Sequence, residues 1–334
     1  MTDPATPLND VLDKVHAQPG GPFIRFRKVL QMKPYPKVIH STHDLIVDLQ
    51  SKGMNIPDFS IAAEEIERIG YYRLRGYAFH FLDNRTGGFL SGTTFDSVLQ
   101  LYHFNYELSS LLFAMSSKVE VALRARLCEA LLSLGDPLIY LDPSIFRDKA
   151  IYWKNLGALC SEINRSDEVF IKHNHINHDG QIPIWAAVEV MSFGNLSKFV
   201  SNLIPGAGTP FSKLAKCYTY TSPKGNTIVP SLDMISSWMH SVVILRNMCA
   251  HNSRLYNRSI NKRPVILASD QQTPQPRYYG LYHMLLSMKY LRPSKDEWNA
   301  FARDFKALLN KYAAHVDLAK LHLPADWKNH LTMA

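Results

Sequence analysis

The stretch TFDSVLQLYHFNYELSSLLFAMSSKVEVALRARLCEALLSL, from Thr94 to Leu134, decides the fold class. Its apolar residues recur about every three or four positions, which is the period of one face of an α-helix. We expect that face to carry Phe95, Val98, Tyr102, Tyr106, Ser109, Phe113, Val119, Leu123 and Leu127. The sequence Gly135-Asp136-Pro137 follows and is typical of a helix end. The stretch therefore predicts one long helix.

Similar spacing and capping signals predict shorter helices over the rest of the chain. We expect them at 41–53, 60–70, 71–77, 148–164, 183–193, 195–203, 231 to beyond 251, 279–290 and 295–313. Ser294, with Glu297 three residues later, forms a capping-box pattern for the last of these. No internal repeat, strand-rich region or strong β-hairpin signal is evident. The predicted fold class is therefore all-α, a helical bundle with long helices and loop insertions.

Proline and glycine mark the segments that we expect to lie outside this bundle. Residues 1–40 are rich in proline and include the basic run Arg25-Phe26-Arg27-Lys28. We interpret them as an N-terminal extension, either a solvated tail or an arm that grips RNA. Residues 41–334 form the predicted helical domain, with loop insertions near 204–229 and 261–277.

Composition narrows the class of protein and its partners. Of the 334 residues, 46% are hydrophobic and 20% are charged, as in ordinary soluble globular proteins. A formal net charge of +8 favours a polyanionic partner such as nucleic acid. No apolar run long enough to span a membrane and no signal peptide is evident, so we expect a cytoplasmic protein without a membrane partner. The four cysteines form no C-x-x-C pair, which excludes a zinc ribbon.

The helix that begins near Pro230 carries an arginine on an apolar face. Leu232, Ile235, Met239, Val242 and Cys249 share that face, and Arg246 falls at its centre. A buried guanidinium is costly without a partner, and Glu189 is one candidate. Asn247 and His251, spaced i and i+4, lie beside Arg246. If the helix continues, Arg254 and Arg258 extend the same polar strip.

These residue types suit the cleavage of RNA without a metal. His251 can exchange protons at neutral pH, and Arg246 can hold a phosphate and stabilise developing charge. Asn247 would orient the histidine or a phosphate oxygen, and the RNA 2′-OH would be the nucleophile. The alternative is a buried arginine paired with an acid, with His251 incidental at the helix end.

Other candidates are open to two interpretations each. Arg75 and His80 repeat the R-x4-H spacing, either as a second catalytic pair or by coincidence. The segment 71–77 mixes tyrosines, among them Tyr72, with Arg73 and Arg75. It predicts either a strip that contacts RNA or a seam between two packed helices. Arg124 is a further candidate RNA contact and an ion-pair partner for Glu120, four residues earlier. The His173, His175 and His178 cluster predicts a surface loop, or else a metal site.

Five segments, in order along the chain, resemble the Abi-like (abortive infection) proteins. They are Ile69–Tyr77 (IGYYRLRGY), Phe95 with Leu101–Asn105 (LYHFN), Val119–Arg124 (VEVALR), Pro183–Ser197 (with PIW, Glu189 and SFGNLS) and Arg246–Arg258 (with RN, AHN and RLYNR). Asn105 stands where the family usually has Asp, and Tyr256 stands where it usually has Trp. The resemblance covers roughly residues 45–258.

The Abi-like family lies within the HEPN superfamily, whose members are helical and often metal-independent ribonucleases that pair two R-x4-6-H motifs across a dimer. It is also similar to the nuclease module of type VI CRISPR effectors. The resemblance implies a bacterial defence endoribonuclease that acts on RNA through Arg246, Asn247 and His251, without a cofactor or metal. General acid–base cleavage needs both a base and an acid, and one chain offers one Arg-His motif, so we expect a homodimer with the helix at 231–252 at or near the interface. We also expect a small RNA or an antitoxin as a partner. The alternative is a non-catalytic protein that holds a small structured RNA.

Overall fold

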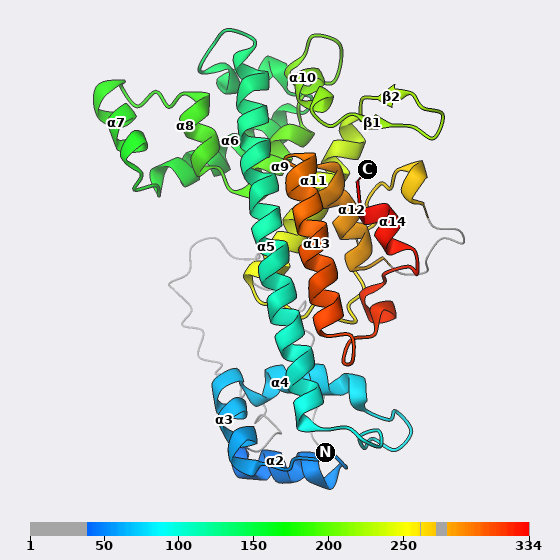
Figure 1. Cartoon of the computed structure of the whole chain (residues 1–334). Coiled ribbons are helices and arrows are strands. Elements are labelled where there is room, and N and C mark those ends of the chain that lie inside the picture. The colour runs from blue at the N-terminus through cyan, green and yellow to red at the C-terminus, as the bar shows by residue number, and fades with distance from the viewer. Residues whose placement is uncertain (1–38, 261, 272–278, 334) are drawn as a thin grey trace, which may run out of the picture. The chain divides into compact units, whose positions relative to one another are not determined.

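One long helix, α5 (Phe95–Leu132), is the element on which most others pack (Figure 1). The computed structural model describes residues 39–260, 262–271 and 279–333. Thr94 caps α5 by accepting a hydrogen bond from the backbone N–H of Ser97. Along its length α5 contacts α4, α8, α9, α10, α11 and α13. The predicted long helix is thus confirmed.

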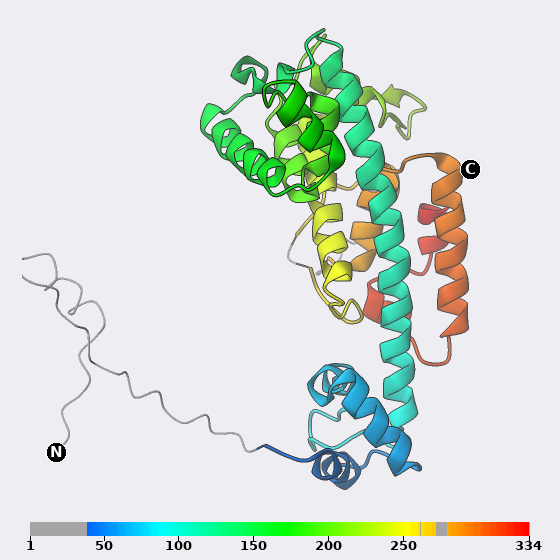
Figure 2. The same cartoon turned by 90° about the vertical axis from the view of Figure 1, so that its left-hand side faces the viewer.

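Three helices pack at the N-terminal end of α5 (Figures 1 and 2). They are α2 (Thr42–Ser51), α3 (Phe59–Ile69) and α4 (Tyr71–Ala78), followed by a 3-10 turn, η1 (Phe79–Phe81). All three helices were predicted from sequence. The side chain of Asp58 caps α3, so that helix begins one residue before the predicted Ser60. Gly70 separates α3 from α4 with φ of 93°, a conformation that glycine adopts without strain.

The segment after α5 folds at the other end of that helix (Figure 1). It comprises η2 (Ile139–Leu141), η3 (Pro143–Ile145), α6 (Lys149–Asn164), α7 (Val169–Asn177), α8 (Ile184–Val190) and α9 (Phe193–Ser201). The helices α6, α8 and α9 agree with prediction. The surface loop predicted around His173 and His175 is wrong, because both residues lie on α7, which packs Ile171 and Asn174 inward. His178 follows as the C-terminal cap of that helix.

The predicted insertion at 204–229 is not a structureless loop. It contains α10 (Pro210–Lys216), which packs on α5. It also contains a hairpin of two strands of two residues each, β1 (Tyr220–Thr221) and β2 (Thr227–Ile228). Tyr220 pairs with Ile228 and Thr221 with Thr227. Strands of two residues are too short for a period-2 pattern to show in sequence. This small sheet leaves the all-α class unchanged.

The C-terminal part supplies the second layer of helices along α5. It contains α11 (Leu232–Ala250), η4 (Ala268–Asp270), α12 (Leu281–Tyr290), α13 (Lys295–Lys311), η5 (Leu318–Leu321) and α14 (Trp327–Leu331). The helix α11 lies between α5, α9 and α12, and α13 packs on α5 from another side. Ser294 caps α13 as predicted, accepting from the backbone N–H of Glu297.

The buried face of α5 is not quite the one predicted. The predicted residues Phe95, Val98, Ser109, Val119, Leu123 and Leu127 are buried, but so are Leu101, Phe104, Leu108, Leu112 and Met115, which were not predicted. By contrast, Tyr106 and Phe113 are 53% and 37% exposed. Because α5 is covered on several sides, apolar residues occur all round it, and periodicity alone does not identify the deepest face.

The described residues from Thr42 onward form one compact unit. The predicted N-terminal extension lies outside the described residues except for its last two positions, and residues 261 and 272–277 of the second predicted loop insertion lie outside them as well. Within the described part, no helix is both long and apolar enough to cross a membrane.

Candidate functional site

The candidate site lies where α11 ends. The helix starts where the sequence predicted, next to Pro230, with Ser231 as its N-terminal cap and His251 as its C-terminal cap. Asn252 follows with φ of 48°, and its N–H donates to the carbonyl of Cys249 (2.9 Å), while the N–H of Ser253 donates to Met248 (2.8 Å). This pair of bonds is the Schellman ending, in which asparagine can replace the usual glycine. The helix therefore stops at the motif and does not continue to Arg254.

Asn247 and His251 are exposed, on the solvent-facing side of α11 that also carries His240. The ring of His251 makes no hydrogen bond or ion pair with any described residue. The amide oxygen of Asn247 lies 3.3 Å from Nη1 of Arg246 and accepts a hydrogen bond from it. The three predicted catalytic residues thus share one helix end, with the histidine open to solvent.

Arg246 forms a long ion pair with an acid on α5, and its Nε makes no hydrogen bond to a described residue. Its Nε lies 3.8 Å from Oε2 of Glu120, and its side chain is 34% exposed. The guanidinium carbon lies 5.7 Å from the ring centroid of Phe113. The partner suggested from sequence was Glu189, which is instead exposed on α8. The charge that Arg246 brings into an apolar face is therefore balanced by Glu120, whose side chain is only 10% exposed.

Arg124 completes this ion-pair cluster. Its Nη2 donates to Oε1 of Glu120, as the i, i+4 spacing predicts, and its Nη1 donates to the carbonyls of Val188 and Glu189 on α8. Only 13% of the Arg124 side chain is exposed. Through these hydrogen bonds Arg124 orients Glu120 and links α5 to α8. The predicted contact of Arg124 with RNA stays a prediction.

Arg254 turns away from the helix end towards η1. Its Nη1 donates to the carbonyl of Gly76 and lies 3.3 Å from Nε2 of His80. The side-chain amide nitrogen of Asn257 lies 3.0 Å from Nδ1 of the same ring. Burial, with the nearby charges of Arg254 and Lys320, lowers the pKa of His80 to about 4.

His80 is consequently neutral at pH 7, and both of its ring nitrogens face protein groups. Arg75, the arginine of the same R-x4-H spacing, lies over the ring of Phe79, with 5.5 Å from its guanidinium carbon to the ring centroid. The second R-x4-H pair is therefore not assembled in this structure. Arg258, predicted to extend the polar strip along α11, is exposed beyond the end of that helix.

The basic and aromatic residues of α4 adjoin the helix end. Nη1 of Arg73 donates to the carbonyl of Asn252 (2.9 Å), which ties α4 to the residue after His251. Tyr72 is 88% exposed, and Arg73 and Arg75 are exposed too. A packed helix–helix seam is therefore wrong for these three side chains. Beside them lies a pocket of ≈ 80 Å³ lined by Arg73, Tyr77, Tyr102, Asn105, Tyr106 and Asn252.

Asn105 is a positioning residue that the sequence reasoning did not assign. Its Oδ1 accepts from the backbone N–H groups of Leu255 (2.7 Å) and Tyr256 (3.3 Å), and its Nδ2 donates to the carbonyl of Ser253 (3.3 Å). It is 2% exposed. An amide both donates and accepts, so asparagine can hold this segment without placing a charge in the core. The sequence signal was its departure from the family's usual Asp.

A metal site has no support in the described residues, which contain no group of three or more His, Cys, Asp or Glu arranged to hold an ion. His173, His175 and His178 are all exposed around α7. Sequence comparison adds one finding. A family model described as Abi-like protein matches residues 64–257, more than half of the chain. No curated protein and no solved structure matched.

Proposed function

The chain belongs to the Abi-like protein family, and we propose that it is a defence endoribonuclease that cleaves RNA at the end of α11. The family points to a role in abortive infection. The observation that carries the proposal is an exposed His251, without a hydrogen bond or ion pair to any described residue, on the same helix end as an Arg246 whose Nε lies 3.8 Å from Glu120. These two residue types can exchange a proton and bind a phosphate.

In the proposed reaction, the neutral ring of His251 removes the proton of a ribose 2′-OH. The 2′-oxygen attacks the adjacent phosphorus, and Arg246 binds the phosphate oxygens and stabilises their added negative charge. The bond from phosphorus to the 5′-oxygen then breaks, and that oxygen takes a proton from a protonated histidine. The products are a 2′,3′-cyclic phosphate and a 5′-hydroxyl, and no oxidant or metal is needed.

One chain supplies the base of this reaction but not the acid. His80 is a neutral imidazole at pH 7 and not the imidazolium acid that the reaction needs, because its pKa is lowered to about 4. The partner's His251 is the economical source, since a two-fold contact brings the same helix end from each protomer together. The solvent-facing side of α11, with partly exposed Val243 and Ile244 between His240 and Asn247, is available for this contact. We therefore propose a homodimer with α11 at its interface.

The test compares two exposed histidines, His251 and His175 of α7. Wild-type protein, His251→Ala and His175→Ala are incubated with single-stranded RNA in EDTA, and both binding and cleavage are measured. We expect His251→Ala to bind RNA with unchanged affinity but to lose cleavage, and His175→Ala to keep both. Equal cleavage by wild type and His251→Ala would refute the assignment of the site.

Non-catalytic RNA binding is the second candidate, favoured by the exposed Tyr72, Arg73 and Arg75 next to the helix end. A binding protein would show no cleavage by the wild type. Its affinity would fall smoothly as arginines are removed, and no single residue would abolish function.

A further inference from the structure

The small pocket beside the end of α11 takes no part in the reaction proposed above. It measures ≈ 80 Å³, and its lining consists of Arg73, Tyr77, Tyr102, Asn105, Tyr106 and Asn252. We call it the tyrosine pocket, after the three tyrosines in its wall. Asn252 directly follows His251, so the pocket lies one residue, about 3.8 Å along the chain, from the proposed catalytic histidine.

Most polar groups of the tyrosine pocket have no partner in the protein. The hydroxyls of Tyr77, Tyr102 and Tyr106 make no hydrogen bond to a described residue, and the side-chain amide of Asn252 makes none either. Arg73 uses Nη1 on the carbonyl of Asn252, which leaves its Nε and Nη2 available. None of the described lining residues is acidic. A ligand edge that carries both hydrogen-bond donors and acceptors would satisfy these groups.

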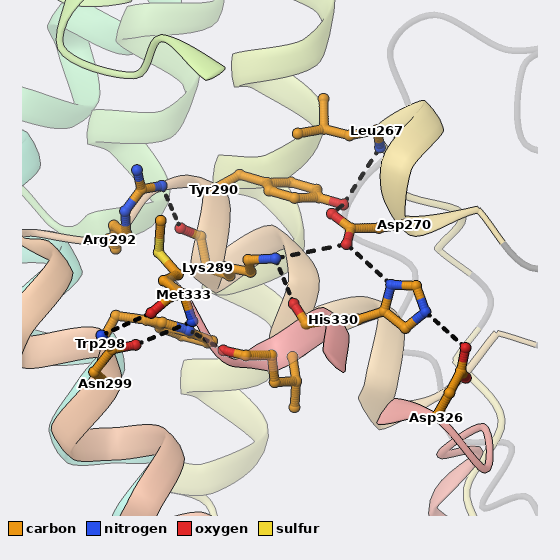
Figure 3. A network of polar contacts seen from close by, with 11 residues as sticks. Leu267, Asp270, Lys289, Tyr290, Arg292, Trp298, Asn299, Asp326, His330 and Met333 are labelled. Carbon is orange, nitrogen blue, oxygen red and sulfur yellow. Dashed lines mark hydrogen bonds and ion pairs between the residues drawn. The ribbon is translucent and has the colours of Figure 1, made fainter. Parts of the chain in front are cut away.

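A larger pocket of ≈ 280 Å³ beside α12 differs, because the acid in its wall is already paired. Figure 3 shows the side chains of Lys289, Tyr290 and His330 converging on the buried carboxylate of Asp270. The Tyr290 hydroxyl donates to Oδ2 of Asp270 (2.9 Å), and Nδ1 of His330 and Nζ of Lys289 lie 3.2 and 3.5 Å from Oδ1. These contacts fasten α14, which carries His330, to η4, which carries Asp270.

The walls of the tyrosine pocket are aromatic as well as polar. Tyr77 is 2% exposed and Tyr106 is 53% exposed, so the pocket has a buried floor and an open aromatic rim. The rings of Tyr77 and Tyr102 meet edge to face, with centroids 5.6 Å apart. Burial raises the pKa of Tyr77 to about 12, so its hydroxyl stays neutral at pH 7 and can both donate and accept.

The size of the tyrosine pocket limits what can enter it. A cavity of roughly 150 Å³ encloses a benzene molecule, and this pocket of ≈ 80 Å³ is smaller. It therefore takes one edge of a planar ring, while the face of that ring lies on the exposed Tyr106.

We propose that the tyrosine pocket receives one unpaired base of the RNA, from a nucleotide next to the scissile phosphate. This rests on the proposed ribonuclease function and adds that the substrate is single-stranded RNA with a preferred base. The base edge would bond the hydroxyls of Tyr77 and Tyr102, and its ring would stack on Tyr106. Successive bases of a stacked strand are about 3.4 Å apart, a step close to that from His251 to Asn252. A base paired in a duplex has its edge occupied and could not enter.

Cleavage of a random pool of 12-nucleotide RNAs in EDTA, with the cut ends sequenced, tests this proposal. We expect the wild-type protein to favour one base at least about fivefold over the least favoured, at one of the two nucleotides next to the cut. Tyr106→Ala should slow cleavage at least about fivefold, because it removes the stacking surface, and Tyr106→Phe should restore the rate. Trp153→Ala is the matched control, because Trp153 is 59% exposed on α6, at the other end of α5, and it should cut like wild type.

A second variant separates base recognition from folding. Tyr102→Phe removes only a hydroxyl without a described partner, so the melting temperature of the free protein should not fall. The base preference should nevertheless shrink at least about threefold. The proposal is overturned if the wild type cuts equally at all four bases, if Tyr102→Phe keeps the full preference, or if Tyr106→Ala cuts as fast as wild type.

Binding separates failure of the tyrosine pocket from failure of the nuclease. The same RNA pool is bound to the His251→Ala protein, which we expect not to cleave, and the recovered RNA is sequenced. If the wild type does not cleave but the recovered RNA shows a favoured base that is lost in the double variant His251→Ala/Tyr102→Phe, the base site stands and the nuclease function fails. Recovery of all four bases in equal proportion would overturn the base site even if the wild type cleaves.

Discussion

Replacing Glu120 by glutamine removes the charge that balances Arg124 and Arg246 while keeping the size of the side chain. Losing one partner of a buried ion pair costs about 3–5 kcal/mol, and an exposed pair contributes at most about 1 kcal/mol. Glu120 is 10% exposed, but Arg246 is 34% exposed. We therefore expect Glu120→Gln to lower the free energy of unfolding by about 2–3 kcal/mol, between these limits.

Urea unfolding followed by helical circular dichroism measures this loss, and the melting temperature should fall by about 3–4 °C. Glu129→Gln is the matched control, because Glu129 is an exposed glutamate on the same helix. Its effect should stay within about 0.5 kcal/mol. In the double variant Glu120→Gln/Arg124→Met, the loss should be about 1 kcal/mol smaller than the sum of the single losses, because the two residues share one interaction. A Glu120→Gln protein as stable as Glu129→Gln would refute the ion-pair cluster.

Three further predictions concern the segment after α11, pH and the RNA strip. Asn105→Leu should destabilise the protein by about 2–4 kcal/mol in the same unfolding assay, because two buried backbone N–H groups lose their acceptor; a loss below that of an ordinary surface change would contradict this role. The pKa of His80 is lowered to about 4 in the folded state, so the unfolded chain binds a proton at this residue more readily than the folded one. The contribution of His80 to the free energy of unfolding should therefore be fully present above about pH 6.5 and be lost as the pH drops from there towards 4. His80→Gln should make that fall shallower in unfolding curves recorded at pH 7 and pH 5, and an unchanged slope would count against the assignment. Arg75→Gln should weaken RNA binding and reduce the slope of log affinity against log salt by about 0.7, whereas Arg303→Gln should leave the slope as it is, and equal slopes for the two variants would exclude an RNA contact by Arg75.

Local signals in the sequence predicted most of the helices, although α7 and α10 were predicted as loops. Ser294 caps α13 as expected, because a cap depends only on residues within one turn. The long apolar period of α5 likewise identified the main helix. Asn252 ends α11 in a left-handed conformation, a helix stop that the sequence prediction did not include. The polar strip was therefore extended too far, to Arg254.

Long-range partners were the part that local sequence could not determine. Arg246 could be placed on an apolar face, but choosing Glu120 over Glu189 requires knowing how α5, α8 and α11 pack. The same holds for Arg254 with His80, which are 174 positions apart, and for Asn105 with Leu255, which are 150 apart. The buried side of α5 also depends on how many helices surround it. Periodicity describes one helix, whereas these features depend on two or three.

The central claim is that the end of α11 cleaves RNA through attack by a 2′-oxygen. The most direct test is an end-labelled RNA with a mapped cleavage site, incubated with wild-type protein in EDTA beside the same RNA with a single 2′-deoxyribose at that site. We expect the unmodified RNA to yield a 2′,3′-cyclic phosphate end and the modified RNA to stay intact there. Cleavage of the modified RNA at the deoxyribose position, or binding of both RNAs without any cleavage, would contradict the claim.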